Sequence, residues 1–251
     1  MREKIKYIMG KKSFHIGMVI IIMVVILFTV GILALRYNVE GETNMPFHLS
    51  RIVLISSSEG MDKEAGENKW AFDINQNNDI YLYIEKNKNY NKQEVIKAIE
   101  IDNLQVQKER EKGTITFYRP NISEEGGNFS NKPVNLVEKI EYIGATETNL
   151  KDLKVSNQGG VIVFRYANDK VAQYVSNEEE INHNDLLKKS KVEEEDLKAT
   201  ITFDLTIKLE SGKEYKANIT LDMPVEGILE KGTTSKEITE VKDIIFKRTK
   251  N

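Results

Sequence analysis

The chain contains no cysteine among its 251 residues. A disulfide-stapled scaffold and a cysteine nucleophile are therefore excluded, and any folded part must be held together by packing alone. Histidine is nearly as scarce, because His15, His48 and His183 are the only three. No two of them have the spacing of a shared metal site, and they leave little material for Ser-His-Asp chemistry. We expect no catalytic residues of these classes.

Other functional signatures are also missing. There is no GxxxxGK[ST] loop to hold phosphates, and nothing in the sequence indicates a cofactor. Residues 37–251 hold 30 basic and 38 acidic residues, a formal charge of −8, with no basic run of the kind that nucleic acid binds. The acidic runs at 178–180 and 193–195 are typical of solvated loop and helix faces. Chemistry by paired carboxylates stays open as an alternative.

One long hydrophobic run is present, FHIGMVIIIMVVILFTVGILAL at residues 14–35, without a formal charge. At 1.5 Å per residue it spans about 30 Å, the thickness of a bilayer's hydrocarbon core. It is longer than the apolar region of a signal peptide, and no small-residue cleavage site follows it. We therefore expect a transmembrane helix whose partner is the lipid bilayer, with a cleaved signal sequence as the alternative.

The charged residues on either side of this run predict its orientation. The preceding tail, residues 1–13, contains five basic residues and one acid, whereas Arg36 alone follows the run before Glu40 and Glu42. The positive-inside rule places such a tail in the cytoplasm. The sequence thus predicts a single-pass protein of the cell membrane whose C-terminal part is extracytoplasmic, after a juxtamembrane linker at 36–50.

Strand patterns dominate the rest of the chain. In ATITFDLTIKLESGKEYKANITLDMP, residues 199–224, apolar and polar residues alternate on both sides of a Ser-Gly turn, which predicts a β-hairpin with one buried face. DIYLYIEK at 79–86, IKAIEIDNLQVQ at 96–107, GTITFYRP at 113–120 and GGVIVFRYA at 159–167 predict further strands. The fold class is therefore mainly β.

Five segments of the first half match five of the second half in the same order, at offsets of about 90 to 104 residues. The matched pairs are 53–60 with 153–160, 78–84 with 168–175, 96–101 with 197–203, a run ending at Pro120 with one ending at Pro224, and 137–143 with 241–247. A duplication of this size predicts two tandem Ig-like β-sandwich domains, 51–148 and 149–251. One larger β-sandwich is the alternative.

The stretch DINQNND places Asp73, Asn75, Asn77 and Asp79 at alternate positions, as in the opening of a calcium loop. Position 12 of such a loop is Ile84 instead of a bidentate Glu, and the flanking segments are predicted strands. In the second half the matching segment, FRYANDKV, has Arg165 in place of Asp73. We therefore expect a hairpin turn without a metal, and keep the four residues as a minor calcium hypothesis.

The segments YNVEGETNMPFHLSRIVLISSSEG, EYIGATETNL and NQGGVIVFRYAND resemble a group of uncharacterised single-span membrane proteins of clostridial-type Gram-positive bacteria. The Lys-, Asn- and Ile-rich composition fits an AT-rich genome. The resemblance covers most of the chain and implies a location at the cell membrane. It implies no activity, and no site residue is carried over from it.

These observations predict a membrane-anchored extracytoplasmic protein that binds or organises another component of the cell envelope, a protein or a polymer, without catalysis. Two alternatives remain open. One is an accessory subunit of a membrane complex, and the other is an envelope-processing enzyme that uses acidic residues. The sequence indicates no oligomeric state.

Overall fold

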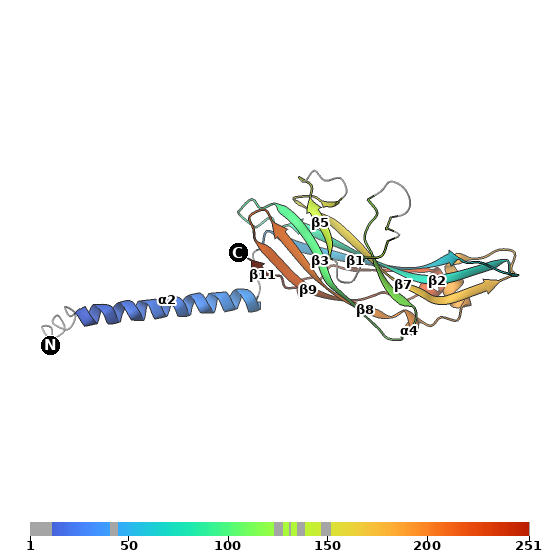
Figure 1. Cartoon of the computed structure of the whole chain (residues 1–251), viewed down its shortest axis with the longest axis horizontal. Helices are drawn as coiled ribbons and strands as arrows, with labels where there is room; N and C mark the ends of the chain where they lie inside the picture. The colour runs from blue at the N-terminus through green and yellow to red at the C-terminus, as the bar shows by residue number, and fades with distance from the viewer. Residues whose placement is uncertain are drawn as a thin grey trace.

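The computed structural model describes residues 12–40, 45–122, 128–130, 132–134, 139–146 and 152–250. Of the predicted cytoplasmic tail, residues 1–11 lie outside the described residues. The described part is mainly β and consists of one long N-terminal helix and a two-sheet body (Figure 1). The helix extends from the end of the body at which the C-terminal strand lies.

Two sheets and a few short helices make up the body. The first sheet has the order β10-β1-β2-β7-β4, with β10 Thr233–Ile238, β1 Phe47–Asp62, β2 Trp70–Lys86, β7 Gly159–Ser176 and β4 Thr114–Tyr118. The second has the order β11-β9-β8-β3-β5-β6, with β11 Lys247–Lys250, β9 Glu214–Asp222, β8 Ala199–Leu209, β3 Ile96–Lys108, β5 Ile140–Gly144 and β6 Leu153–Val155. The short helices are η1 His183–Asp185, α3 Leu186–Lys189, α4 Glu194–Leu197 and α5 Ile228–Lys231.

The long helix α2, Lys12–Glu40, contains the apolar run expected at 14–35. Its window Gly17–Ala34 has a mean hydropathy of 3.0 and none of it is buried, so the helix is long and apolar enough to cross a membrane. The helix continues through residues 36–40, and β1 begins at Phe47. Much of the predicted linker at 36–50 is therefore regular structure, and Phe47 is fully buried in the body.

Strands from both predicted domains pair with each other in both sheets. In the first sheet β2 pairs with β7, and in the second β3 pairs with β8, both antiparallel. The main core likewise combines residues from both sides of the expected boundary at 148/149, such as Leu82 and Ile101 with Phe203 and Ile219. The tandem Ig-like arrangement is therefore corrected to the alternative, one larger β-sandwich, because each half supplies strands to both sheets.

The sheet order also removes the support for a duplication. The matched runs ending at Pro120 and Pro224 belong to different sheets, since β4 lies in the first and β9 in the second. Two other matched pairs belong to strands that are hydrogen-bonded neighbours, β2 with β7 and β3 with β8. Neighbouring strands bury the same kind of surface, and that shared environment accounts for their similar patterns.

The predicted hairpin at 199–224 is confirmed as β8 and β9, which pair antiparallel. Gly212 adopts a φ of +84° in the turn, a conformation that favours glycine. The alternate apolar residues of both strands face the core, whereas the residues between them form a polar outer face. The strands predicted at 79–86, 96–107, 113–120 and 159–167 are confirmed within β2, β3, β4 and β7.

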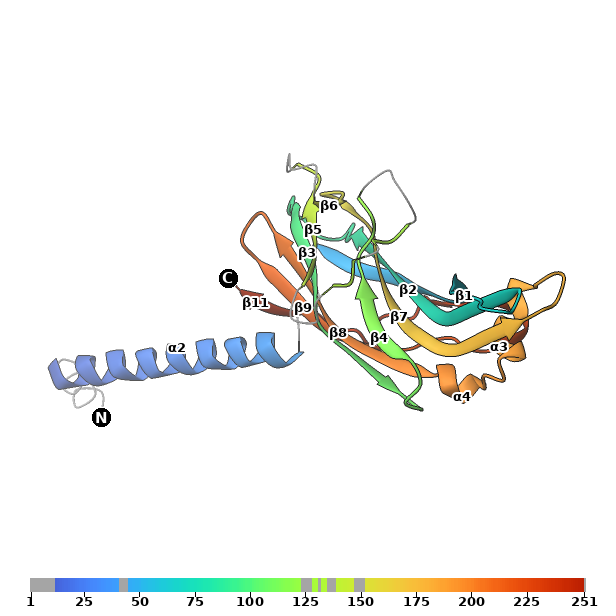
Figure 2. The same cartoon turned by 45° about the vertical axis from the view of Figure 1, so that its right-hand side comes forward.

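A second, smaller core lies toward the end of the body that is remote from α2. Phe72 and Ile74 of β2, with Val171 and Tyr174 of β7, pack there against Leu186, Leu187, Val192, Leu197 and Ile228 from the short helices and their connections. β2 and β7 contribute residues to both cores, and Figure 2 shows them curving together toward α3 and α4. The long strands therefore connect the two cores.

Tyr142 joins the two sheets at an edge. Its hydroxyl accepts a hydrogen bond from the backbone N–H of Val163 at 3.0 Å and donates one to the carbonyl of the same residue. β4 pairs with β7 only from Tyr118 and Arg165 onward, so Val163 lies beyond the end of its neighbour. The tyrosine takes the place of a strand partner for these two backbone groups.

Candidate functional site

The stretch DINQNND lies in the middle of β2, so the hairpin turn predicted there is wrong. β2 pairs with β1 on one side and with β7 on the other along this stretch, with a register shift in the β7 ladder at Asn75. The turn that joins β1 to β2 is formed by residues 63–69 instead. Polar residues remain in the strand because their side chains have partners on both faces of the sheet.

The four candidate calcium ligands lie on the outer face of β2, and each has a partner. Asp79 accepts two hydrogen bonds from the Arg165 guanidinium, at 2.6 and 3.0 Å. Asp73 forms ion pairs with Lys63 at 3.0 Å and with Lys170 at 3.6 Å. Asn75 accepts a hydrogen bond from the Lys170 backbone N–H at 2.9 Å, and Asn77 donates one to Glu59 at 2.6 Å.

This geometry does not form a calcium site. An extended strand separates Asp73 from Asp79 by about 20 Å, whereas calcium ligands all lie about 2.3–2.6 Å from one ion. The hydrogen bond from Lys63, together with the charge of Lys170, holds the pKa of the Asp73 carboxyl below its usual range. That carboxylate is already neutralised by two cations. Among the described residues, no group of three His, Asp or Glu side chains is arranged to hold a metal ion.

Millimolar calcium is therefore expected to leave the melting temperature of the protein unchanged, because a ligand stabilises a fold only when it binds the folded state. The measurement is a thermal melt with calcium and with the same ionic strength of sodium chloride. A calcium-specific increase that disappears in Asp79→Asn would contradict this expectation.

Buried amides occupy the inner face of the same stretch. Gln76 and Asn78 are fully buried between the two cores, and Asn78 accepts a hydrogen bond from Ser56 at 2.5 Å. The Gln76 amide donates to the carbonyl of Leu197 at 3.1 Å. These bonds fasten α4 to the sheet and fix the register of β1 against β2 at the level where the main core ends. The group is structural.

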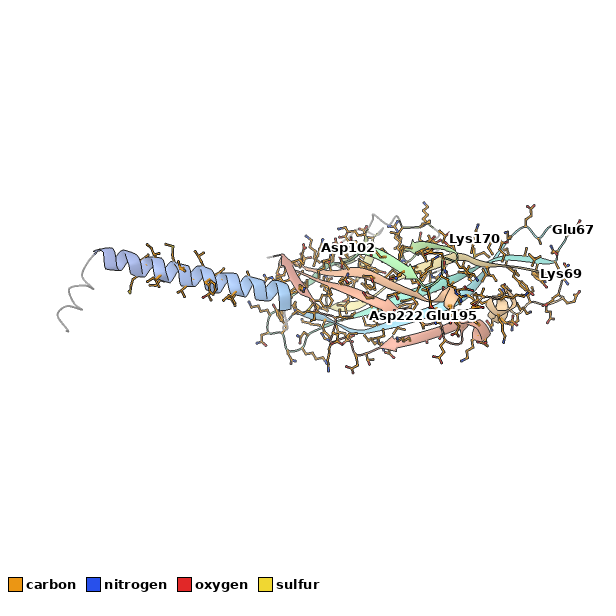
Figure 3. The ribbon with its side chains drawn as sticks, turned by 90° about the horizontal axis from the view of Figure 1, so that it is seen from below. Glu67, Lys69, Asp102, Lys170, Glu195 and Asp222 are labelled. Carbon is orange, nitrogen blue, oxygen red and sulfur yellow. The ribbon has the colours of Figure 1, made fainter. Side chains whose placement is uncertain are left out.

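An open groove of about 910 Å³ lies along one edge of the sandwich. Its wall on one side comes from β3 and β5, with Asp102, Lys139 and Glu141, and on the other from the segment after β4, with Arg119. Figure 3 labels Asp102 in the half of the body that is nearer to α2. The groove volume falls in the range of ligand sites, and charged side chains surround it.

A charged network on the outer face of the second sheet adjoins this groove, since Lys139 belongs to both. Glu100 is 6% exposed, and its carboxylate is held by Lys139 and by Lys208, the latter at 2.7 Å. Burial raises the pKa of Glu100, but the hydrogen bonds from the two lysines outweigh it and bring the pKa below its usual range. Burial and a hydrogen bond with Glu100 raise the pKa of the neighbouring Glu141.

The network continues along β3, β8 and β9. Lys216 contacts Asp204 at 2.9 Å and Asp102 at 3.5 Å, and Asn103 and Asn218 each donate a hydrogen bond to Asp204. The hydrogen bonds from these amides and from Lys216 outweigh burial and lower the pKa of Asp204. The outer face is therefore a preorganised array of charges and amides.

The groove could hold a polar ligand, because it presents acids and bases beside its apolar side chains. Glu100 and Glu141 form a carboxylate pair beside a groove, which is what the enzyme alternative requires. Glu100, however, is covered by two lysines. The acids that line the groove are Asp102, Glu141 and Asp152. This arrangement suits binding by ion pairs and hydrogen bonds better than proton transfer.

The candidate residues of the groove were not identified from the sequence. A signal was present, since in the strand predicted at 96–107 Glu100 and Asp102 alternate with Ile99 and Ile101, which places both acids on the outer face. The sequence does not show which segments lie beside β3, because β5 and the segment after β4 are brought next to it only by the tertiary fold. No family model, curated protein or solved structure matches this chain.

Proposed function

We propose that this protein is a single-span membrane-anchored protein that holds its β-sandwich outside the cytoplasm and binds a polar partner of the cell envelope. The observation that carries the proposal is a fully exposed apolar helix joined to a well-packed body that presents a charged groove. The partner is a protein or a polymer with charged and hydrogen-bonding groups. Binding takes place without catalysis.

The anchor follows from the energetics of α2. Its apolar side chains are exposed over the whole window Gly17–Ala34, and a soluble fold does not leave so much apolar surface in water. The five basic residues of the N-terminal tail support a cytoplasmic location for that tail. The body is therefore extracytoplasmic.

The orientation is tested with single cysteines, since the natural chain has none. Glu179, whose side chain is 93% exposed, is changed to Cys in one variant, and Lys4 in another. A membrane-impermeant maleimide added to intact cells is expected to label Glu179→Cys and to label Lys4→Cys only after permeabilisation. The reverse pattern would refute the orientation.

The binding role predicts an effect of charge reversal at the groove. Arg119→Glu places an acid opposite Glu141 and Asp102 and should weaken a partner that bridges the two walls by about tenfold, or 1.4 kcal/mol. The measurement is photo-crosslinking in intact cells from a label on Glu141→Cys, with and without Arg119→Glu. A label on Glu179→Cys, near the remote end of the body, is the position control.

Lys236→Glu, an exposed change on β10, is the charge control and should leave the adduct intact. Equal adducts from the groove label and from the control label would contradict the groove as the binding site. A partner that co-purifies in detergent through α2 alone, after the body has been removed by protease, would favour the complex-subunit alternative.

A further inference from the structure

A second groove, of about 630 Å³, lies at the end of the body next to α2. His48 and Leu49 of β1 form one side, and Val241, Ile244 and Ile245 from the segment before β11 form the other. Phe246 is 5% exposed and fastens this segment to the main core, whereas Ile245 is 54% exposed. The segment therefore presents an apolar side chain outward from a fixed position.

The chain itself brings this end of the body close to the membrane-crossing window. α2 ends at Glu40, about 9 Å beyond Ala34 along the helix, and the body begins at Met45. Five residue steps cover at most about 18 Å even when extended. β11, which directly follows Phe246, lies beside α2 (Figure 1).

The charges around Ile245 complement an anionic lipid surface. Between residues 242 and 249 there are three basic residues, Lys242, Lys247 and Arg248, and one acid, Asp243. The part of the chain after Arg36 has a formal charge of −8, so this segment has the opposite sign from the body as a whole. Basic residues near an anionic membrane surface are attracted to it by the charge of its headgroups.

We propose that the segment 241–248 docks on the bilayer, with Ile245 at the boundary between headgroups and acyl chains and its basic residues on anionic lipid headgroups. This inference rests on the membrane anchoring proposed above. The window of α2 is fully exposed and does not cover Ile245. Docking at this end makes the sandwich stand upright, with Glu67 and Lys69, at the opposite end in Figure 3, furthest from the membrane.

The single tryptophan of the chain supplies the test, because Trp70 lies next to Lys69 at the remote end. The full chain is reconstituted in phosphatidylcholine vesicles with and without phosphatidylglycerol, and quenching by brominated lipids is measured. In Trp70→Phe with Ile245→Trp we expect at least about twofold quenching, stronger with phosphatidylglycerol, whereas Trp70 in the natural chain is not quenched.

Lys242→Glu with Lys247→Glu in the same reporter background should remove the difference between the two lipid compositions. Quenching at position 245 no greater than at Trp70 overturns the proposal. Vesicle flotation distinguishes a failure of the anchoring from a failure of the docking. A chain that does not float with the vesicles contradicts the membrane anchor, whereas a chain that floats without quenching contradicts only the docking of segment 241–248. Ile245→Cys carrying an environment-sensitive dye repeats the measurement with Trp70 unchanged.

Discussion

Phe203→Ala is expected to lower the free energy of unfolding by about 3–5 kcal/mol and to destabilise both halves of the chain together. Phe203 is fully buried on β8, and its ring packs edge-to-face against Phe164 of the opposite sheet, with centroids 5.2 Å apart. Removing it leaves a cavity between the two sheets that the surrounding strands cannot fill without moving. Because both halves supply strands to both sheets, the cost falls on a single cooperative unit.

Amide hydrogen exchange on the full chain in detergent micelles distinguishes this from tandem domains. Amides of β3, such as Ile99 and Ile101, should lose as much protection as those of β8, although β3 lies in the first half. Val175→Ala, at a side chain that is 52% exposed, is the control and should change stability by about 0.5 kcal/mol or less. Unchanged protection of β3 in Phe203→Ala would show that the halves fold separately.

The local part of this fold could be predicted from the sequence. The hairpin of β8 and β9 is encoded by alternation around a turn, so each strand carries its own signal and the pairing is between neighbours in the chain. The apolar helix is equally local. The pairings of β2 with β7 and of β3 with β8 join residues about 74 to 113 apart in the chain, and nothing in the pattern of one strand identifies a partner at that distance.

The stretch around Asp73–Asp79 was predicted wrongly because its polarity has a tertiary cause. Asp79 belongs in a strand because Arg165, on the neighbouring strand, is paired with it in register. Asn78 belongs in a core because Ser56 donates to it from the other neighbour. Without those partners, a stretch so rich in Asn and Asp is typical of a turn. The groove was missed for the same reason, since its walls come from segments that only the fold brings together.

The second large effect is expected at Asp196, whose side chain is fully buried at the start of α4. It accepts hydrogen bonds from the Glu193 backbone at 3.0 Å and from Arg110 at 3.1 Å, and it also binds Lys112. Glu193 caps α4 in return, so one carboxylate fixes the helix and connects it to the turn between β3 and β4. Asp196→Asn keeps the shape but removes the charge, and should cost about 2–3 kcal/mol.

The stabilisation by Asp196 is expected to decrease in acid. Burial raises the pKa of Asp196, but the bonds from Glu193, Lys112 and Arg110 outweigh it, so the folded pKa lies below the unfolded value of about 3.9. The stabilisation is therefore complete above about pH 4 and is lost as the pH falls through the folded pKa.

Denaturant melts should show a difference in the free energy of unfolding between the natural chain and Asp196→Asn that is constant near neutral pH and shrinks in acid. Glu179→Gln, at an exposed ion pair with Lys69, should unfold like the natural chain throughout. A difference that persists unchanged in acid would mean that Asp196 stabilises the fold by its shape and not by its charge.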